Sequence, residues 1–286
     1  MSQPLNNVSI VLIHGAWHSA AHWAAAQRAL ARRGLSSTAL DLPGHGVDAP
    51  TPAGYLLDGQ PGLDTEKSAL ADVTVQDGAE VILTHATELK AQGRRVVVVA
   101  HSAGGGPASL AAEQAPDVFD RLVYLSAFIP AGRPRFTDYI NDPRNSCAAA
   151  IPMLGDPTLL GANRINPLSE DPSVVDAIRY AFYDDLPANA SDTWRQFLHP
   201  DEPFSSLNAP VMLSAQRWGR VPRTYIRLTD DRALPPVTQD LMRVEADEMS
   251  PDTTASVHDL PGGHSPFLTR PDELAALLAA VSLPAR

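Results

Sequence analysis

A run of β-branched residues that leads into a serine among small residues constrains this chain more than any other feature. The run reads Val96-Val97-Val98-Val99-Ala100-His101-Ser102-Ala103-Gly104-Gly105-Gly106. The four valines predict a strand that is buried on both faces, as in a parallel sheet. Small residues two positions before and after Ser102 permit a tight strand-to-helix turn that exposes the serine hydroxyl. The segment therefore predicts a nucleophile elbow, which is typical of serine hydrolases.

Two other interpretations of this chemistry are weaker. A glycine-rich turn after a strand can bind phosphate, but the chain contains neither a G-x-G-x-x-G nor a G-x-x-x-x-G-K-S/T segment, so no nucleotide cofactor is expected. The single cysteine, Cys147, follows no predicted strand, so we do not expect it to be the nucleophile. One cysteine also excludes an intrachain disulfide and a cysteine-cluster metal site.

The composition favours a small-molecule partner. The 286 residues are 44% hydrophobic and 19% charged, as in ordinary soluble proteins, and the net charge is −11. This negative charge argues against nucleic acids and anionic membranes as partners. No stretch approaches the roughly 20 apolar residues of a membrane span, and residues 1–7 lack the basic start of a secretion signal, so we expect a cytoplasmic protein. The sequence makes no prediction about oligomeric state.

Strand-like and helix-like segments alternate along much of the chain. Strands are predicted at 8–13, 37–42, 96–99, 122–128, 224–228 and 256–260, and longer helices at 20–33, 75–92, after the serine to 114, and 272–281. This alternation predicts an α/β fold with a doubly wound, mostly parallel sheet. Ligands of such sheets bind beyond the carboxyl ends of the strands.

Two segments interrupt the alternation. Residues 131–218 are rich in proline, and their helical pieces at 174–183 and 193–198 are short, so we predict a helical cap inserted into a core of residues 1–130 and 219–286. Residues 47–74 are longer than most connections and contain proline and glycine, which predicts a functional loop or a partial lid.

A serine hydroxyl needs a base to remove its proton, and the base is usually a histidine. His264 follows the last predicted strand in Leu260-Pro261-Gly262-Gly263-His264, where two glycines allow the turn to bring the ring over Ser102. His258 is the nearest rival, but it lies inside that strand. We therefore predict that His264 is the base.

The histidine in turn needs a carboxylate to orient it. Asp230 and Asp231 directly follow the strand at 224–228, whereas no acid follows the strand at 122–128 before Asp138. We expect one member of the pair to orient the histidine and the other to serve a turn. Either choice gives the order serine, acid, histidine that is expected of an α/β-hydrolase.

The same chemistry requires donors for an oxyanion. The backbone N–H of Ala103, next to Ser102, is the first expected donor, and the N–H of Ala16 is the second. Gly15 allows the backbone twist that would aim Ala16 inward. We also expect Trp17, beside Ala16, to contact the substrate.

Two longer segments carry a resemblance to a known family. Residues 11–18 (Val-Leu-Ile-His-Gly-Ala-Trp-His) and 225–236 (Tyr-Ile-Arg-Leu-Thr-Asp-Asp-Arg-Ala-Leu-Pro-Pro) resemble the α/β-hydrolase family, in the branch of plant methyl esterases and hydroxynitrile lyases. The resemblance covers nearly the whole chain. It implies that the catalytic acid is Asp231, four residues before the proline of the Leu-Pro pair, and that His264 is the catalytic histidine.

The resemblance also carries implications for the reaction. The lyases have a threonine where this chain has Gly15, and a lysine, whose charge stabilises departing cyanide, where it has Ser265. Both departures favour ester hydrolysis. The 47–74 segment, with Tyr55-Leu56 and Gly59-Gln60-Pro61-Gly62-Leu63, is similar to bacterial serine-dependent macrolide esterases, which implies opening of the lactone ring of a macrolide antibiotic, and hence resistance.

Large apolar side chains in and near the predicted cap favour a bulky hydrophobic ester or lactone: Met153, Leu154, Leu159, Leu160, Trp194, Phe197 and Trp218. These side chains could equally form the cap's own core. A general small-molecule esterase, a C–C bond hydrolase and a ligand receptor of the same fold stay open as alternatives. His14, His18 and His22 have i, i+4 spacing but no helical H-x-x-x-H pair with a nearby carboxylate, so no metal site is predicted.

Overall fold

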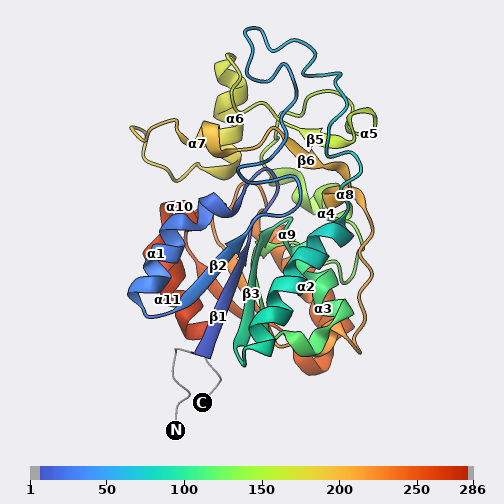
Figure 1. Ribbon diagram of the computed structural model, residues 1–286, viewed down its shortest axis with the longest axis vertical. Coiled ribbons are helices and arrows are strands. Elements are labelled where there is room, and N and C mark those ends of the chain that lie inside the picture. Colours follow the sequence, from blue (N-terminus) through green and yellow to red (C-terminus); the bar gives the residue numbers. More distant parts are fainter. Residues whose placement is uncertain (1–6, 283–286) are drawn as a thin grey trace.

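The computed structural model describes residues 7–282, which fold around a six-stranded sheet (Figure 1). Its strands are β1 (Val8–Ile13), β2 (Ser36–Leu40), β3 (Arg95–Ser102), β4 (Arg121–Ala127), β7 (Arg223–Leu228) and β8 (Ser256–Leu260). All of them are parallel and lie in the order β2-β1-β3-β4-β7-β8. This confirms the predicted doubly wound sheet. The strand order reverses between β1 and β3, so a crevice opens beyond the carboxyl ends of these two strands.

Helices cover both faces of the sheet (Figure 1). One face packs against α1 (Ala24–Arg32), α10 (Pro266–Thr269) and α11 (Pro271–Ser282), and the other against α2 (Val75–Ala91), α3 (Gly105–Gln114) and α9 (Pro236–Met249). The valines of β3 explain why both faces are needed. Val97 and Val99 pack in the core on the side of α1 and α11, whereas Val96 and Val98 pack in the core on the side of α2 and α3.

The elements differ from the predicted ones at several boundaries. The helix predicted at 20–33 begins as a 3₁₀ turn, η2 (Ala20–Trp23), and the strand predicted at 96–99 extends to Ser102. The sequence analysis does not identify α9 at all. Two of its four buried residues, Thr238 and Gln239, are polar, so its apolar periodicity is weak. No helix within residues 7–282 is long and apolar enough to cross a membrane.

A helical cap formed between β4 and β7 lies over the carboxyl edge of the sheet (Figure 1). Its elements are α4 (Phe136–Ile140), α5 (Pro157–Leu160), β5 (Ala162–Arg164), α6 (Pro172–Phe182), α7 (Trp194–Phe197), β6 (Asp201–Pro203) and α8 (Phe204–Asn208). The antiparallel pair of β5 and β6 was not predicted. Short 3₁₀ turns complete the chain: η3 (Pro116–Val118), η4 (Pro143–Cys147), η5 (Trp218–Arg220) and η6 (Pro251–Thr253).

The 47–74 segment packs against this cap. Arg164 of β5 is fully buried and forms a bidentate ion pair with Asp201 of β6. Its Nε donates to Oδ1 at 2.5 Å, and its Nη2 donates to Oδ2 at 2.8 Å. Its Nη1 donates to the backbone carbonyls of Leu63 (2.6 Å) and Glu66 (3.0 Å). One buried guanidinium thus joins both strands of the small sheet to the loop, which forms an outer layer of the cap.

Candidate active site

Ser102 lies on a tight turn at the carboxyl end of β3. Its φ of 50° is in the left-handed region, which typically costs a non-glycine residue about 1–3 kcal/mol. A Cβ at Gly104 would collide with the carbonyl oxygen of His14, and one at Gly105 with that of Phe128. The turn therefore tolerates only glycine at these two positions, of which the sequence analysis had singled out Gly104.

The structure brings His264 and Asp231 together. His264 Nδ1 donates to Asp231 Oδ2 over 2.7 Å, and both side chains are buried. Two further donors hold the carboxylate, namely the Ser126 hydroxyl at 2.6 Å on Oδ2 and the Leu234 N–H at 2.8 Å on Oδ1. Ser126, at the end of β4, was missed in the sequence analysis. It occupies the strand end where that analysis looked for an acid and found none.

The neighbouring carboxylates have a different task. Asp230 Oδ2 accepts from the Thr229 hydroxyl (2.8 Å) and the Gly262 N–H (3.0 Å), and these hydrogen bonds lower its pKa. Asp185 of the cap accepts from the Gly263 N–H at 3.1 Å. Both carboxylates fix the glycine turn before His264. The rival histidine, His258, stays within β8 and does not line the cavity of Ser102.

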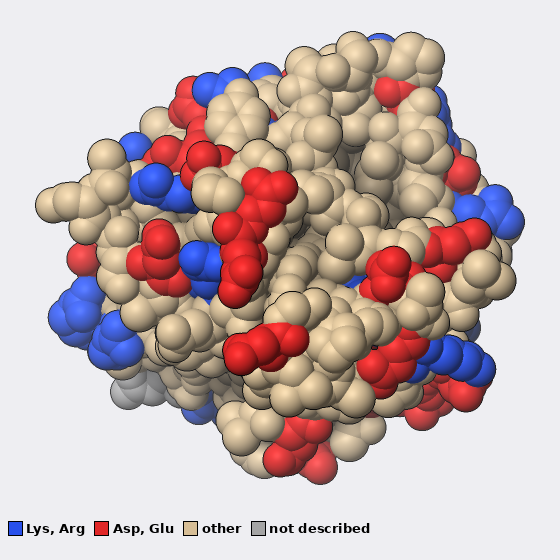
Figure 2. All heavy atoms as spheres, turned by 90° about the horizontal axis from the view of Figure 1, so that it is seen from above, with Lys and Arg blue, Asp and Glu red and all other residues tan. Residues whose placement is uncertain are grey.

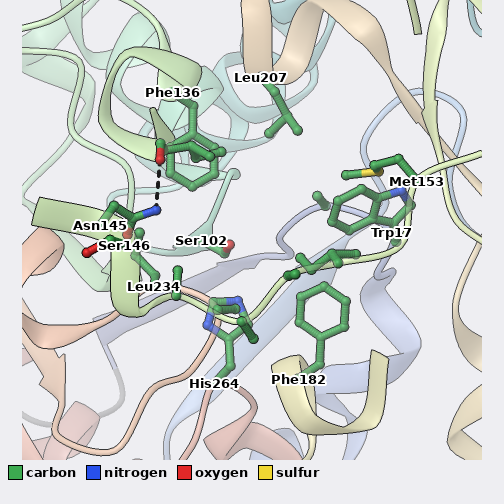
Figure 3. Close-up of a pocket in the computed structure, with 17 residues that line it drawn as sticks. Trp17, Ser102, Phe136, Asn145, Ser146, Met153, Phe182, Leu207, Leu234 and His264 are labelled. Atoms are coloured by element: carbon green, nitrogen blue, oxygen red, sulfur yellow. Dashed lines mark hydrogen bonds between the residues drawn. The ribbon is translucent and has the colours of Figure 1, made fainter. Parts of the chain in front are cut away.

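Ser102 and His264 both line one cavity of about 380 Å³, and Figure 3 shows their side chains close together on its wall. Aromatic and aliphatic side chains from the core and the cap form most of the remaining lining, including Trp17, Phe136, Phe182, Leu207 and Leu234. Asn145 and Ser146 add polar groups, and Asn145 Nδ2 donates to the carbonyl of Ile140 at 3.0 Å. The cavity is therefore mostly apolar, and its polar side chains are Ser102, His264, Asn145 and Ser146.

The apolar residues singled out in the sequence have mostly other roles. Only Met153 of the seven lines the cavity. Trp194 is buried against Tyr183 in the cap, with ring centroids 5.1 Å apart. Trp218 is buried next to the sheet, where its Nε1 donates to the Tyr124 hydroxyl at 2.8 Å. Bulk and hydrophobicity alone did not distinguish the cavity wall from the core.

The two expected oxyanion donors flank Ser102. Within residues 7–282, neither the N–H of Ala16 nor that of Ala103 donates to a protein acceptor. Ala16 lines the cavity, and Ala103 precedes α3, whose N-terminus favours negative charge. Trp17 also lines the cavity and donates its indole Nε1 to the carbonyl of Asn163 at 2.8 Å.

Several buried histidines lie near the site, and His101 packs against His264 with ring centroids 4.5 Å apart. His101, next to Ser102, donates from Nε2 to the carbonyl oxygen of His264 at 2.9 Å, so it positions the backbone of that residue. Burial lowers the pKa of His14, His18 and His101 well below the ordinary value. Among the described residues, no group of three or more His, Cys, Asp or Glu side chains is arranged to hold a metal ion. Figure 2 views the molecule from the side of the cap and shows Asp and Glu spread over this face.

A comparison with known families identifies the family of this chain. The model of the alpha/beta hydrolase family matches residues 10–277. The chain belongs to the alpha/beta hydrolase family. Among its curated relatives in this family is a pyrethroid hydrolase of Sphingobium wenxiniae, which is 29% identical over 94% of this chain and 86% of the relative.

Further relatives within the alpha/beta hydrolase family come from plants and from solved structures. Methylesterase 7 of Arabidopsis thaliana is 26% identical, and the match covers 97% of both chains. The crystal structure of polyneuridine aldehyde esterase matches with a TM-score of 0.71 at 20% identity, over 96% of this chain and 99% of the other. The curated relatives are hydrolases and esterases, and the solved structure shares the fold.

The buried histidines predict that acid destabilises the protein. Since His14, His18 and His101 stay neutral when folded, the unfolded state binds more protons below pH 6.5, and stability falls as pH falls. His45, whose pKa is raised by Glu202 despite burial, carries a proton in both states in that range. Between pH 6.5 and 5, we expect each histidine that stays neutral in the folded state to lower the free energy of unfolding, measured in urea, by about 1.4 kcal/mol for each pH unit.

The variant His101→Gln provides the control. It removes one of the groups that protonate on unfolding, so its stability should decline less steeply with acid than that of the wild type. A wild-type free energy of unfolding that stays constant from pH 7.5 to 5 would contradict this account of the site.

Proposed function

We propose that the chain is a serine hydrolase of carboxylic esters, with Ser102 as nucleophile, His264 as general base and Asp231 as the residue that orients the base. One observation carries the proposal, namely the hydrogen bond of 2.7 Å from His264 Nδ1 to Asp231 in a cavity that also contains Ser102. Because Asp231 engages Nδ1–H, the neutral ring keeps its Nε2 lone pair for the proton of Ser102.

The reaction then follows from these groups. Ser102 Oγ bonds to the ester carbonyl carbon while His264 Nε2 takes its proton, and the N–H groups of Ala16 and Ala103 bind the oxyanion. The C–O bond to the alcohol breaks, and the alcohol leaves with the proton from His264. A water that loses its proton to His264 attacks the acyl carbon. Collapse of the second intermediate releases the acid and returns the proton to Ser102.

The substrate is an uncharged ester or lactone with a bulky apolar part. The cavity of about 380 Å³ is at the lower end of the roughly 300–1,000 Å³ that small-molecule sites occupy, and most of its lining is apolar. Relatives named pyrethroid hydrolase and methylesterase support ester hydrolysis. The net charge of −11 disfavours anionic substrates.

A macrolide lactone is the finer part of this proposal. It rests on the resemblance of the 47–74 segment to bacterial macrolide esterases. That segment packs on the cap through Arg164 and contributes no residue to the lining of the cavity. A macrolide would therefore place its lactone carbonyl at Ser102 and keep much of the ring outside, whereas a small ester would fit inside entirely.

The cap belongs to the same proposal. We assign residues 131–218 to it and residues 1–130 and 219–286 to the catalytic core. All six strands of the main sheet come from the core, and the cap supplies lining residues such as Phe136 and Phe182. The cap would thus determine which ester reaches Ser102.

The first test compares two substrates. We expect the wild type to hydrolyse p-nitrophenyl butyrate, and Ser102→Ala to lose at least about 10³-fold in kcat, because no other group supplies the nucleophile. The variant Cys147→Ser should keep wild-type activity, since this thiol is exposed and lies outside the cavity lining. Mass spectrometry on a 16-membered macrolide tests the finer proposal, for which the product must gain one water in a Ser102-dependent manner.

The outcomes separate the alternatives. Turnover of the small ester alone would indicate a general esterase and reject the macrolide. No Ser102-dependent turnover of either substrate would overturn the esterase proposal in favour of a C–C bond hydrolase or a ligand receptor.

A second prediction concerns Gly15, the position at which the hydroxynitrile lyases have a threonine. A Cβ at Gly15 would lie 2.6 Å from the Cβ of Ser102 and 2.9 Å from Nδ1 of His101, so the position has no room for the threonine of the lyases. We expect Gly15→Ala to lower kcat/KM for the butyrate ester by at least about 10²-fold, because the loop that holds Ala16 must shift. The control is Gly34→Ala, where the φ of 73° strains an alanine but a Cβ meets nothing within 4 Å, so this variant is destabilised without a clash at Ser102. Wild-type kcat/KM in Gly15→Ala would contradict the prediction.

A further inference from the structure

The loop that carries Ala16 is held in place by the cap. Trp17 is buried, with 3% of its surface exposed, and has a φ of 60°, which is unusual for a bulky residue. Its carbonyl oxygen accepts from the His199 N–H at 2.8 Å, and its N–H donates to Glu202 Oε2 at 2.9 Å. His199 and Glu202 both lie in the cap, so Trp17 depends on cap residues for its main-chain hydrogen bonds.

The peptide between Ala16 and Trp17 is fixed at both ends. Its N–H donates to Glu202, and its carbonyl oxygen accepts from His18 Nδ1 at 2.7 Å. His18 must then carry its proton on Nδ1, and its Nε2 accepts from the hydroxyl of Tyr183 at 2.9 Å. Tyr183 directly follows α6 of the cap. Two cap residues, Glu202 and Tyr183, thus determine how this peptide plane is turned.

Glu202 is suited to this task because its carboxylate is buried yet ionised. Only 4% of its surface is exposed, and His45 Nε2 lies 2.9 Å from Oε2. Burial opposes ionisation, but the charge and the hydrogen bond of His45 outweigh it and lower the pKa of Glu202. A buried carboxylate accepts a stronger hydrogen bond from a backbone N–H than a neutral group does.

We propose that Glu202 is a positioning residue for the oxyanion hole, which the cap completes by holding the Trp17 N–H away from the cavity and the Ala16 N–H toward it. This inference rests on the proposed esterase function. Without the Glu202 acceptor, the Trp17 N–H would be buried and unpaired, and the peptide plane would turn to find another partner. The rotation would move Ala16 from its place beside Ser102.

The test replaces Glu202 in two ways. Glu202→Leu removes the acceptor, so kcat for p-nitrophenyl butyrate should fall about 10²- to 10³-fold, as for loss of one oxyanion donor, while KM changes less than about threefold. Glu202→Gln keeps an oxygen for the Trp17 N–H and should recover at least about tenfold of the lost kcat. The rate at which a phosphonate ester labels Ser102 should fall in parallel with kcat, because its adduct also needs the oxyanion hole.

The preceding residue provides a matched control. Asp201 lies on the same strand with 3% exposure, but it points to the opposite face and pairs with Arg164. Asp201→Asn therefore disturbs a buried carboxylate of β6 without touching Trp17. We expect it to lower the melting temperature as Glu202→Leu does and to leave kcat within about threefold of the wild type.

Each outcome decides one question. Wild-type kcat in Glu202→Leu, or an equal loss of kcat in Asp201→Asn, would overturn the positioning role. If Glu202→Leu fails to fold, Glu202→Gln decides the question. The role would be overturned if this variant keeps the wild-type kcat while phosphonate labels Ser102 more slowly, or if its kcat falls as low as that of Ser102→Ala. Wild-type turnover that survives in Ser102→Ala would instead overturn the proposed function, independently of Glu202.

Discussion

The arrangement of the site depends on the close packing of the turn after β3. There, the backbone carbonyls of His14 and Phe128 approach Gly104 and Gly105 so closely that no Cβ fits. These close contacts hold the end of β1, the end of β4 and the start of α3 near Ser102. They also keep the backbone of Ser102 in the strained left-handed region, with a φ of 50°. Because β1 and β4 flank β3, the same packing places the Ala16 loop on one side of Ser102 and Ser126, with Asp231 behind it, on the other.

The cap is therefore part of the site as well as its cover. Asp185 of the cap holds the Gly263 N–H in the turn before His264, and Glu202 holds the Trp17 N–H in the loop of Ala16. Both contacts join a cap carboxylate to a core backbone amide. A change in the seating of the cap would then alter the geometry of the reacting groups along with access to the cavity.

The sequence could be used to predict those parts of the candidate site that strand ends determine. The valines before Ser102 and the glycines before His264 indicated which residues leave the sheet at its carboxyl edge, and both now line one cavity. Asp230 and Asp231 both follow β7, so only the family resemblance separated them. Ser126 and Glu202 carry no local motif, since their roles arise from partners 105 and 185 residues away. The sequence left open whether the large apolar residues line the cavity or form a core, and in the structure Trp218 is buried in the core while Met153 lines the cavity.

The structure of a phosphonate adduct tests the central claim most directly. The account predicts a covalent bond from phosphorus to Ser102 Oγ, with the phosphoryl oxygen about 3 Å from the N–H groups of Ala16 and Ala103 and His264 still bonded to Asp231. An adduct on another residue, or a phosphoryl oxygen that points away from both N–H groups, would contradict it.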